Sequence, residues 1–394
     1  MQNNLLNRKK EIFIAENKRR EFIKKVGLGA ASVGVAGVAG VLGGQTKTKS
    51  SLPPKAASLN VCKPKSIQWE MVTTWPAHFP ILGQGADRFA RWVDEMSCGR
   101  LKIKVYGSGE LVAPMEVFDT VSQGNAQMGH GAAYFWTQTS LAAQFFASVP
   151  FGFNAQQMNA WLYSGGGMAL WNEIYAPFNL KPFIAGNTGV QMGGWFNKKI
   201  NSMADFKGLK MRIPGLGAKV LERAGGKPMI AAGDHIYASL TKGTMDAAEW
   251  LGPFHDLKMG FHKTAKYYYY PGWHEAGTGI EAMVNQDAWN LLPQDLKAIV
   301  EAAAYKSNIW MLSEFESKNT RALHELVTRH QVQLKKFPDP VLKNLEKISL
   351  EVLEQMASSD PLTRKVYDSF LNFRDQMTVW NKTGQNICQG NHYI

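Results

Sequence analysis

A regular alternation of strand-like and helix-like segments begins at Ser66 and constrains the fold more than any other feature of the sequence. Residues Ser66–Thr73 and Leu101–Gly107 are strand-like, and in the second segment apolar residues alternate with lysines. Residues Ile81–Met96 and Pro114–Gln123 carry apolar side chains at helical spacing. Such alternation is typical of an α/β sheet covered by helices, and open sheets of this kind bind ligands at the carboxyl ends of their strands.

A second α/β stretch runs from about residue 189 to residue 273. Gly189–Met192 and Leu209–Ile213 are strand-like, and Gly217–Arg223 and Asp234–Lys242 have helical spacing. A chain of 394 residues is long enough for two or three domains. The two stretches therefore predict two lobes with a cleft between them, a geometry that suits hinge closure on a small ligand.

The last part of the chain is predominantly helical. After a strand-like segment at Gly279–Asn285, helical patterns run from Leu292 to His330 and from Pro340 to Met377. Pro293 is well placed for the first turn of the earlier helix. Long C-terminal helices are therefore expected.

Residues 1–57 are expected to be an export signal and a spacer. Lys18–Lys24 (KRREFIK) approximates the twin-arginine signal, and the apolar run Val26–Leu42 is short for a membrane-spanning helix. A polar spacer follows, with a cleavage region near Ala56-Ala57. A basic amphipathic helix or an N-terminal anchor is the alternative. The pattern favours a periplasmic protein exported by the twin-arginine pathway.

The charge is concentrated at the N-terminus. The formal net charge of the chain is +12, but residues 1–65 contain 13 Lys and Arg against 3 Glu. The remainder is nearly neutral and contains no nucleic-acid-binding motif, so no nucleic-acid partner is expected. None of the three cysteines, Cys62, Cys98 and Cys388, has metal-ligand spacing. A bridge between Cys62 and Cys98 is one option in an oxidising compartment.

Two motifs resemble those of a known family. Phe206–Pro214 (FKGLKMRIP) and Ile236–Trp250 (IYASLTKGTMDAAEW) are similar to signatures of the DctP-type substrate-binding subunits of tripartite ATP-independent periplasmic (TRAP) transporters. The similarity covers roughly Ser66 to Asp375. Gly189–Phe196 (GVQMGGWF) and the segment from Tyr267 to Glu275 resemble a narrower branch, which binds 2-oxo or 2-hydroxy monocarboxylates together with a metal cation.

The resemblance implies a two-lobe periplasmic-binding-protein fold with a hinge, a ligand cleft between the lobes and long C-terminal helices. It implies lobe I at residues 66–188 and 274–315, lobe II at 189–273 and 316–345, and a C-terminal helical segment at 346–394. The protein would capture a small organic acid by lobe closure and deliver it to the membrane permease subunits of a TRAP transporter. The family contains monomers and dimers, so a homodimer through the C-terminal helices is a further expectation.

Arg212 is the first candidate for ligand binding. It follows a strand pattern and precedes Pro214, so it is expected where a strand ends at the crevice. A guanidinium group matches a carboxylate because it can donate two parallel hydrogen bonds. On spacing alone, a surface position or a structural ion pair remains open, and the resemblance favours binding of the ligand carboxylate.

The resemblance also implies a cation held by Gln191, Glu249, Glu275 and the backbone carbonyl of Trp250. Sodium and calcium take oxygen ligands of these kinds. A cation between two carboxylates would remove their mutual repulsion, and it could bridge the carboxylate and the 2-oxygen of the ligand. The alternatives are that Glu249 and Glu275 are separate surface residues or helix caps, or that a basic residue pairs with them in place of a metal. No organic cofactor is expected.

Aromatic residues are expected to form the pocket walls, because small-molecule pockets are mostly apolar with a few placed polar groups. The candidates are Tyr134, Phe135, Trp195 and Trp250, and Asn187 is a weaker polar candidate. Tyr134 could also donate its hydroxyl to the ligand. For Tyr134, Phe135 and Trp195, packing in a core is the alternative.

No catalytic motif stands out in the sequence. There is no G-x-S-x-G elbow and no credible Cys–His nucleophile pair, and Gly165–Gly167 lacks the lysine of a phosphate-binding loop. Four histidines are interpreted as structural or surface residues: His235, His255, His262 and His274. A binding protein is therefore expected. The alternatives are an exported periplasmic enzyme, with an acid or base near Arg212, and a sensory module that presents the acid to a membrane receptor.

Overall fold

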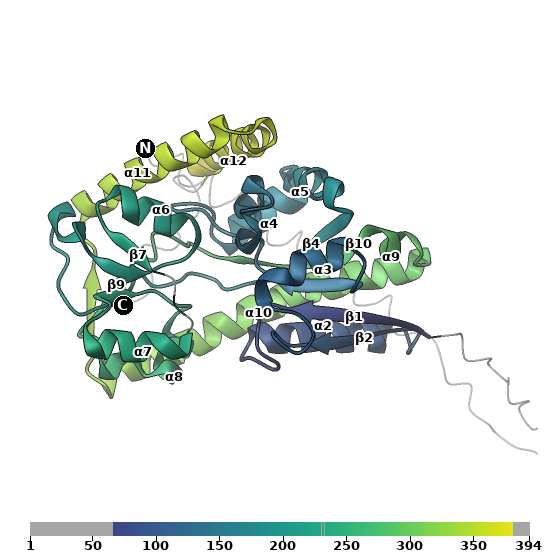
Figure 1. Cartoon of the computed structure of the whole chain (residues 1–394), viewed down its shortest axis with the longest axis horizontal. Coiled ribbons are helices and arrows are strands. Elements are labelled where there is room, and N and C mark those ends of the chain that lie inside the picture. Colours follow the sequence, from purple (N-terminus) through teal and green to yellow (C-terminus); the bar gives the residue numbers. More distant parts are fainter. Residues whose placement is uncertain (1–65, 230, 232, 381–394) are drawn as a thin grey trace, which may run out of the picture. The chain divides into compact units, whose positions relative to one another are not determined.

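The computed structural model describes residues 66–229, 231 and 233–380, which contain two mixed β-sheets with helices around them (Figure 1). Sheet A has the strand order β2-β1-β3-β10-β4. Strand β1 is parallel to β2 and β3, whereas β10 is antiparallel to β3 and β4. The strands are β1 (Ile67–Thr73), β2 (Leu101–Tyr106), β3 (Met128–Gly131), β4 (Leu180–Asn187) and β10 (Gly279–Asn285).

Sheet B has the strand order β11-β9-β5-β8-β6-β7. Its centre is antiparallel, because β5 runs against both β8 and β9, and its two edges are parallel pairs. The strands are β5 (Gly194–Phe196), β6 (Lys210–Arg212), β7 (Lys227–Met229), β8 (Ala247–Ala248), β9 (Tyr267–Tyr270) and β11 (Gln333–Lys336).

Most of the described helices pack beside only one of the two sheets, and one long helix packs beside both. Around sheet A lie α2 (Leu82–Met96), α3 (Val117–Ser122), α4 (Ala155–Ser164), α5 (Gly167–Tyr175) and α9 (Gln286–Asn290). Around sheet B lie α6 (Gly215–Arg223), α7 (Gly233–Lys242) and α8 (Pro253–Met259). Helix α10 (Gln294–Thr328) contacts β4 and α2 beside sheet A and α8 beside sheet B, and Figure 1 shows it running along both. Short 3₁₀ turns complete the chain: η1 (Pro114–Glu116), η2 (Ala133–Trp136), η3 (Leu141–Phe146), η4 (Ala176–Phe178), η5 (Met203–Phe206) and η6 (Phe261–Lys263).

The last two helices also connect the two parts. Helix α11 (Asp339–Ser358) packs on α6, whereas α12 (Pro361–Trp380) packs on η3, α4 and α5. The buried face of α12 is aromatic: Phe370 lies 4.1 Å from Phe153 and 5.6 Å from Phe145, ring centre to ring centre. Burial of such rings contributes most of the packing energy at a contact of this kind.

Two irregular segments cross side by side between the sheets. Residues 188–193 connect β4 to β5, and residues 271–278 connect β9 to β10. The Thr188 N–H donates to the Thr278 carbonyl at 3.0 Å, and the Gln191 N–H donates to the Glu275 carbonyl at 3.4 Å. A Cβ on Gly272 would lie 2.3 Å from the Gln191 carbonyl oxygen, so only glycine permits this approach. These two segments are called the crossing segments below.

One expectation about secondary structure is wrong, and one helical pattern is confirmed but divided into two helices. Gly189–Met192 was expected to be a strand, but it lies in a crossing segment, and β5 begins only at Gly194. Gly189 and Gly194 both have positive φ, which interrupts a strand at each end of this segment. The pattern Pro340–Met377 forms two helices, because Pro361 cannot continue α11 and instead begins α12, where the Asp360 carboxylate accepts the Thr363 N–H at 2.7 Å.

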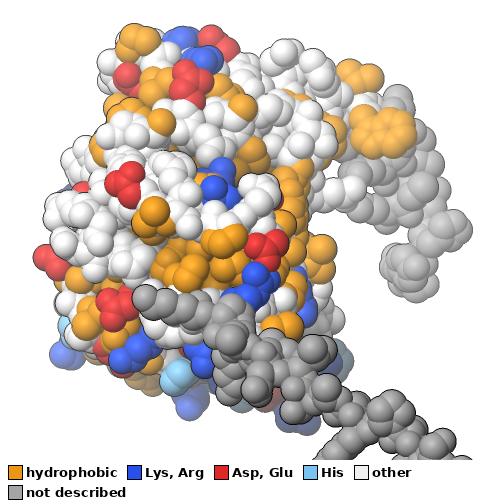
Figure 2. Space-filling view, turned by 90° about the vertical axis from the view of Figure 1, so that its right-hand side faces the viewer, with side chains coloured by type: hydrophobic (Ala, Val, Ile, Leu, Met, Phe, Trp, Pro, Cys, Tyr) orange, Lys and Arg blue, Asp and Glu red, His pale blue; other side chains and the backbone are white. Residues whose placement is uncertain are grey.

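The expected export signal at residues 1–57 and two of the cysteines, Cys62 and Cys388, lie outside the described residues. Cys98 is exposed. Within the described part of the chain, no helix is both long enough and apolar enough to span a bilayer. Figure 2 shows one face of the molecule, on which apolar side chains gather between basic and acidic ones.

Candidate functional site

A cavity of about 560 Å³ lies between the two sheets and contains most of the predicted site residues. Many of its lining residues directly follow a strand: Thr74 follows β1, Arg212 ends β6, and Trp250 lies just beyond β8. This is the strand edge at which open α/β sheets bind ligands. The lining residues are Thr74, Trp75, Pro76, Phe79, Leu82, Tyr134, Phe135, Gln191, Arg212, Pro214, Trp250, Leu251, Met259 and Glu275.

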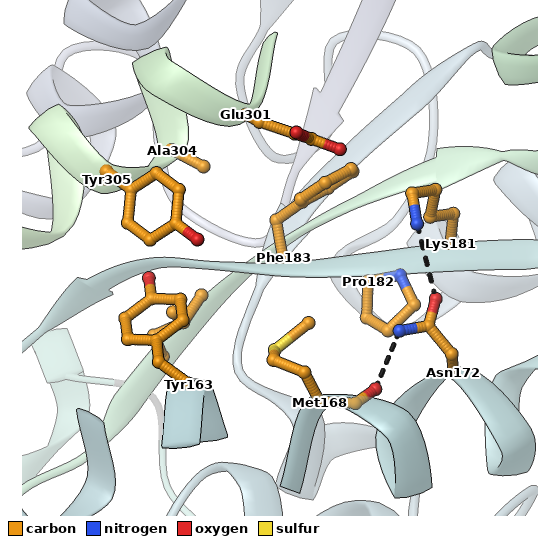
Figure 3. Close-up of a pocket in the computed structure, with 10 residues that line it drawn as sticks. Tyr163, Met168, Asn172, Lys181, Pro182, Phe183, Glu301, Ala304 and Tyr305 are labelled. Carbon is orange, nitrogen blue, oxygen red and sulfur yellow. Dashed lines mark hydrogen bonds between the residues drawn. The ribbon is translucent and has the colours of Figure 1, made fainter. Parts of the chain in front are cut away.

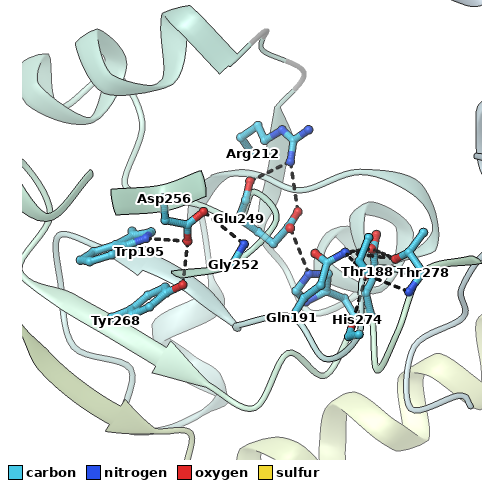
Figure 4. A network of polar contacts seen from close by, with 12 residues as sticks. Thr188, Gln191, Trp195, Arg212, Glu249, Gly252, Asp256, Tyr268, His274 and Thr278 are labelled. Atoms are coloured by element: carbon cyan, nitrogen blue, oxygen red, sulfur yellow. Dashed lines mark hydrogen bonds and ion pairs between the residues drawn. The ribbon is translucent and has the colours of Figure 1, made fainter. Parts of the chain in front are cut away.

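Arg212 lies at the sheet B side of this cavity, and its position is fixed from several directions. Its Nη1 atom donates to the Glu249 carbonyl oxygen at 2.7 Å and to the Glu249 carboxylate at 3.1 Å (Figure 4). The guanidinium carbon lies 4.7 Å from the centre of the Trp250 ring, in a cation–π contact. The side chain is 16% exposed, so the group is held rigidly but still reaches the cavity. Its remaining N–H donors can bind an anion.

Glu249 lies behind Arg212 and does not line the cavity itself. Its side chain is 1% exposed, and its second carboxylate oxygen lies 3.5 Å from His274 Nε2. Neither ring nitrogen of His274 has a hydrogen-bond partner among the described residues. His274 was interpreted from the sequence as structural or surface, and no spacing signal connects it with Glu249. The structure buries it beside one of the candidate carboxylates.

Gln191 and Glu275 come from the two crossing segments and meet in one polar cluster. Gln191 Nε2 donates to the Glu275 carboxylate at 2.7 Å and to Thr278 Oγ1 at 3.1 Å, and Thr278 Oγ1 also donates to Glu275. Thr188 Oγ1 lies 3.3 Å from Gln191 Nε2. Neither threonine was predicted as a site residue, because a single threonine in a loop forms no recognisable sequence motif. Figure 4 shows Thr188, Gln191 and Thr278 together in this cluster.

The electrostatics of this cluster favour a cation. Burial, and then the negative charge of Glu249, raise the pKa of Glu275 to about 7. The Gln191 Oε1 atom is buried and has no hydrogen-bond partner among the described residues. An unpaired amide oxygen on a residue that is hydrogen-bonded to Glu275, with the charge of Glu249 acting on the same carboxylate, is a donor set that fits a hard cation such as sodium or calcium. Within the described residues, no group of three or more His, Cys, Asp and Glu side chains could hold a metal, so amide and backbone oxygens would be needed.

The apolar walls come mainly from the sheet A side. Tyr134 and Phe135, in η2, line the cavity together with Trp75 and Phe79. Desolvation, and then the charges of Glu275 and Glu249, hold the pKa of Tyr134 well above its usual range. Tyr134 therefore keeps its proton and can donate a hydrogen bond to an anion. Trp250 lines the opposite side.

Besides Glu249, two of the predicted site residues, Trp195 and Asn187, do not line the cavity. Trp195 is fully buried in sheet B, where its ring stacks on Tyr268 at 4.0 Å and its Nε1 atom donates to Asp256 at 2.9 Å. Asn187 ends β4, is also fully buried, and accepts the Gly189 N–H at 2.9 Å through its side-chain oxygen. For Trp195, packing in a core therefore describes its position. Asn187 shapes the start of a crossing segment.

A second cavity, of about 230 Å³, lies beside β4 in the sheet A part (Figure 3). Tyr163 and Tyr305 stand at one end, with ring centres 4.7 Å apart, and Lys181 and Asn172 stand at the other. Its charged residues, Lys181 and Glu301, do not converge with any predicted site residue. The cavity between the sheets is therefore the better candidate site.

Residues 71–360 match the family described as bacterial extracellular solute-binding protein, family 7. The chain is similar to a monocarboxylate 2-oxoacid-binding periplasmic protein of Nostoc sp. (strain PCC 7120). The two are 43% identical over 322 residues, which cover 81% of this chain and 87% of that protein.

Solved structures of two proteins share the fold. A TRAP periplasmic solute-binding protein from Colwellia psychrerythraea, with bound calcium and pyruvate, has 41% identity and a TM-score of 0.80, and the match covers 83% of this chain and all (100%) of that one. A TRAP periplasmic solute-binding protein from Pseudoalteromonas atlantica, with bound sodium and pyruvate, has 39% identity and a TM-score of 0.79, with 84% and 100% covered. The expected two-lobe α/β fold with long C-terminal helices is thereby confirmed.

Proposed function

This chain belongs to family 7 of the bacterial extracellular solute-binding proteins, as the solute-binding subunit of a TRAP transporter, and we propose that it captures a 2-oxo or 2-hydroxy monocarboxylate together with a sodium or calcium ion. The observation that carries this proposal is the convergence of Arg212, Gln191 and Glu275 on one cavity between the sheets. The relatives named above bind 2-oxoacids, and pyruvate with calcium or sodium.

In this proposal Arg212 binds the carboxylate of the ligand. Its guanidinium is held by Glu249 and by the Trp250 ring, so little conformational entropy is lost when an anion binds. Tyr134 adds a hydroxyl donor from the other side of the cavity. The neutral hydroxyl of Tyr134 and the positively charged guanidinium of Arg212 together would select an anionic ligand.

The cation would be held by Gln191, Glu249, Glu275 and the backbone carbonyl of Trp250. When bound, it would neutralise the two carboxylates and attract the carboxylate and 2-oxygen of the ligand. The unpaired Gln191 Oε1 atom and the raised pKa of Glu275 support this assignment. Glu249 already accepts hydrogen bonds from Arg212, so it would serve the cation and the arginine together.

The crossing segments would act as the hinge. They are joined to each other by backbone hydrogen bonds, and each carries a candidate cation ligand, Gln191 or Glu275. Lobe I is proposed at residues 66–188 and 274–315, lobe II at 189–273 and 316–345, and the C-terminal helical segment at 346–394. Ligand and cation would then favour the closed arrangement because they contact both lobes.

A role without catalysis is proposed, since the carboxylates of the site are engaged by Arg212, Gln191 and Thr278 and offer no free base. An exported enzyme on the same fold would convert the bound acid, and a sensory module would present it to a membrane receptor. Incubation with the best ligand separates the enzyme from the binding protein, because only an enzyme consumes the acid.

We further propose that a twin-arginine signal directs export to the periplasm, where the loaded protein meets the membrane permease subunits. Fusion of residues 1–57 to a reporter, with Arg19 and Arg20 changed to Lys, tests the export route. Export that persists after this change would exclude the twin-arginine pathway. A homodimer through α11 and α12 is tested by light scattering, and a monomeric mass would exclude it.

The experiment that tests the main proposal is thermal unfolding of the mature protein with a panel of small carboxylates. Each acid is tested in sodium-free buffer with a chelator, and again with sodium or calcium restored. A ligand of the native state raises the melting temperature by mass action. We expect a shift with 2-oxo or 2-hydroxy acids that needs the cation. A shift without the cation would remove the metal site, and no shift with any acid would refute the proposed ligand class.

A further inference from the structure

A buried acid lies behind each wall of the main cavity, and neither acid belongs to the site described above. In the sheet A part, Glu281 of β10 is 0% exposed. Its carboxylate accepts hydrogen bonds from Trp136 Nε1 and from the Tyr175 hydroxyl, the latter at 2.9 Å. Trp136 is the last residue of η2, the turn that carries the wall residues Tyr134 and Phe135. Glu281 therefore fixes the turn from behind.

In the sheet B part, Asp256 of α8 is 1% exposed and is held in a similar way (Figure 4). Its Oδ2 atom accepts from Trp195 Nε1 at 2.9 Å and from the Tyr268 hydroxyl at 2.7 Å. Its Oδ1 atom accepts the Gly252 N–H at 3.2 Å. Gly252 directly follows Trp250 and Leu251, which line the cavity. Asp256 therefore ties the wall loop to the rigid pair Trp195–Tyr268.

The two arrangements share their chemistry although they lie on different sheets. Each carboxyl receives one indole N–H and one phenol O–H, and among the described residues neither makes an ion pair with a basic side chain. Burial of an acid without a countercharge is costly, and hydrogen bonds offset only part of that cost. An aromatic core does not need such a group for packing alone. The presence of a buried carboxyl behind both walls of the cavity indicates that these carboxyls help to position the walls.

We propose that Asp256 and Glu281 are positioning residues, each of which holds one wall of the cavity at the distance that the bound acid requires. The inference rests on the proposed function for its effect on ligand affinity, but its effect on the walls does not depend on a ligand. Neither carboxyl touches the ligand. Both act through the backbone that carries Trp250 and Leu251 on one side and Tyr134 and Phe135 on the other.

The hydrogen-bond geometry predicts different outcomes for the conservative amide at the two positions. Asp256 faces N–H donors on both of its oxygens, so in Asp256→Asn the new amide N–H must point at another N–H in either orientation. In Glu281→Gln, the amide can point at the Tyr175 hydroxyl, which can rotate to accept, while its oxygen still accepts from Trp136. The amide is therefore tolerated at position 281 but not at position 256.

The test measures amide hydrogen exchange in the ligand-free protein and acid affinity by calorimetry with the cation present. We expect Asp256→Asn to speed exchange in residues 250–254 and to weaken the affinity for the best acid by about tenfold or more. Glu281→Leu should speed exchange in residues 133–136 and weaken the affinity similarly, whereas Glu281→Gln should change it by less than about threefold. Asp205→Asn is the matched control, because Asp205 accepts the Asn201 N–H at 2.8 Å in the same lobe, and its side-chain hydrogen bonds among the described residues reach no residue that lines the cavity.

Several outcomes separate this inference from the proposed function. If the wild type binds no acid but Asp256→Asn still loosens residues 250–254, the proposed function fails and the positioning role stands. If Asp256→Asn and Glu281→Leu keep normal exchange and normal affinity, the positioning role is refuted. If Asp256→Asn does not fold, Tyr268→Phe removes one donor alone, and unchanged exchange in residues 250–254 of that variant would equally refute the role of Asp256.

Discussion

The two sides of the main cavity differ in the chemistry that they offer. The sheet A side supplies Trp75, Phe79, Leu82 and Phe135, which are apolar, and the hydroxyl of Tyr134. The sheet B side and the crossing segments supply Arg212, Gln191 and Glu275, with Glu249 behind them. The difference indicates that one end of a ligand is recognised by charge on one side, and that its apolar body is recognised by packing on the other. Closure of the two lobes would therefore be needed for one ligand to contact both sides of the cavity.

If the sheet B side binds the ligand through charge, removal of that charge should weaken binding more than any other single change. Arg212→Ala should weaken binding of a 2-oxo acid by about 2–5 kcal/mol, the usual cost of truncating one partner of a buried hydrogen-bonded charge pair. Isothermal titration calorimetry measures the loss. Arg212→Lys should recover only part of it, because an ammonium group cannot form the bidentate contact.

Arg212→Ala needs a control, because it leaves the buried Glu249 carboxylate without its arginine partner. Arg212→Ala also removes both hydrogen bonds that Nη1 donates to Glu249, one to the backbone carbonyl and one to the carboxylate, and the Glu249 side chain is only 1% exposed. The double variant Arg212→Ala, Glu249→Gln relieves that buried charge, so it should regain stability without regaining affinity for the acid. Recovery of affinity in the double variant would mean that Arg212 acts on Glu249 and not on the ligand.

Removal of the cation tests the other half of the polar side. In sodium-free buffer with a chelator, or in Glu275→Gln, the affinity for a 2-oxo acid should fall by about 10- to 100-fold, or about 1.4–2.8 kcal/mol, because the ligand loses an electrostatic contact. Glu301→Gln is the matched control, since Glu301 lies in the second cavity. Equal binding in sodium-free buffer with chelator and after sodium or calcium is restored would contradict a cation in the site.

The fold was largely predictable from the sequence, because it depends on periodic patterns. The strand at Gly279–Asn285 has the same bounds in the structure, and α2 begins one residue after the predicted start. The strand predicted at Gly189–Met192 failed because two glycines with positive φ and close backbone contacts outweigh its apolar pattern. Local patterns do not report such tertiary contacts.

The candidate site was predictable only in part. Arg212, Gln191 and Glu275 carried motif signals, and all three reach one cavity. His274 and Asp256 did not, because a buried histidine beside a carboxylate and an acid between two aromatic residues are brought together by tertiary folding alone. Trp195 illustrates the converse: it lies in a recognisable motif, yet it packs in a core.

The buried acid behind each side of the cavity should make the stability of the protein depend on pH. Burial raises the pKa of Glu281 and of Asp256 to about 7, above their ordinary values of 4.5 and 3.8. Between these limits the folded state binds more protons than the unfolded state, so stability should fall as pH rises towards 7 and then level off. Glu281→Gln should reduce the stability difference between pH 5 and pH 8 by about 1–2 kcal/mol, measured by urea unfolding with chelator present. An undiminished difference would contradict the assignment to Glu281.

The smallest expected effect concerns the apolar wall. Phe79 lines the cavity and stacks on His255, with ring centres 5.5 Å apart. If this side binds the apolar body of the ligand, Phe79→Ala should cost about 1 kcal/mol for 2-oxo acids with a side chain of several carbons, because roughly 40 Å² of apolar contact is lost. Pyruvate, which has only a methyl group there, should lose much less. Calorimetry with a series of 2-oxo acids measures the trend, and Tyr163→Ala in the second cavity is the control. An equal loss for every acid would mean that Phe79 supports closure and not the ligand, and the division between a polar and an apolar side would then fail at this residue.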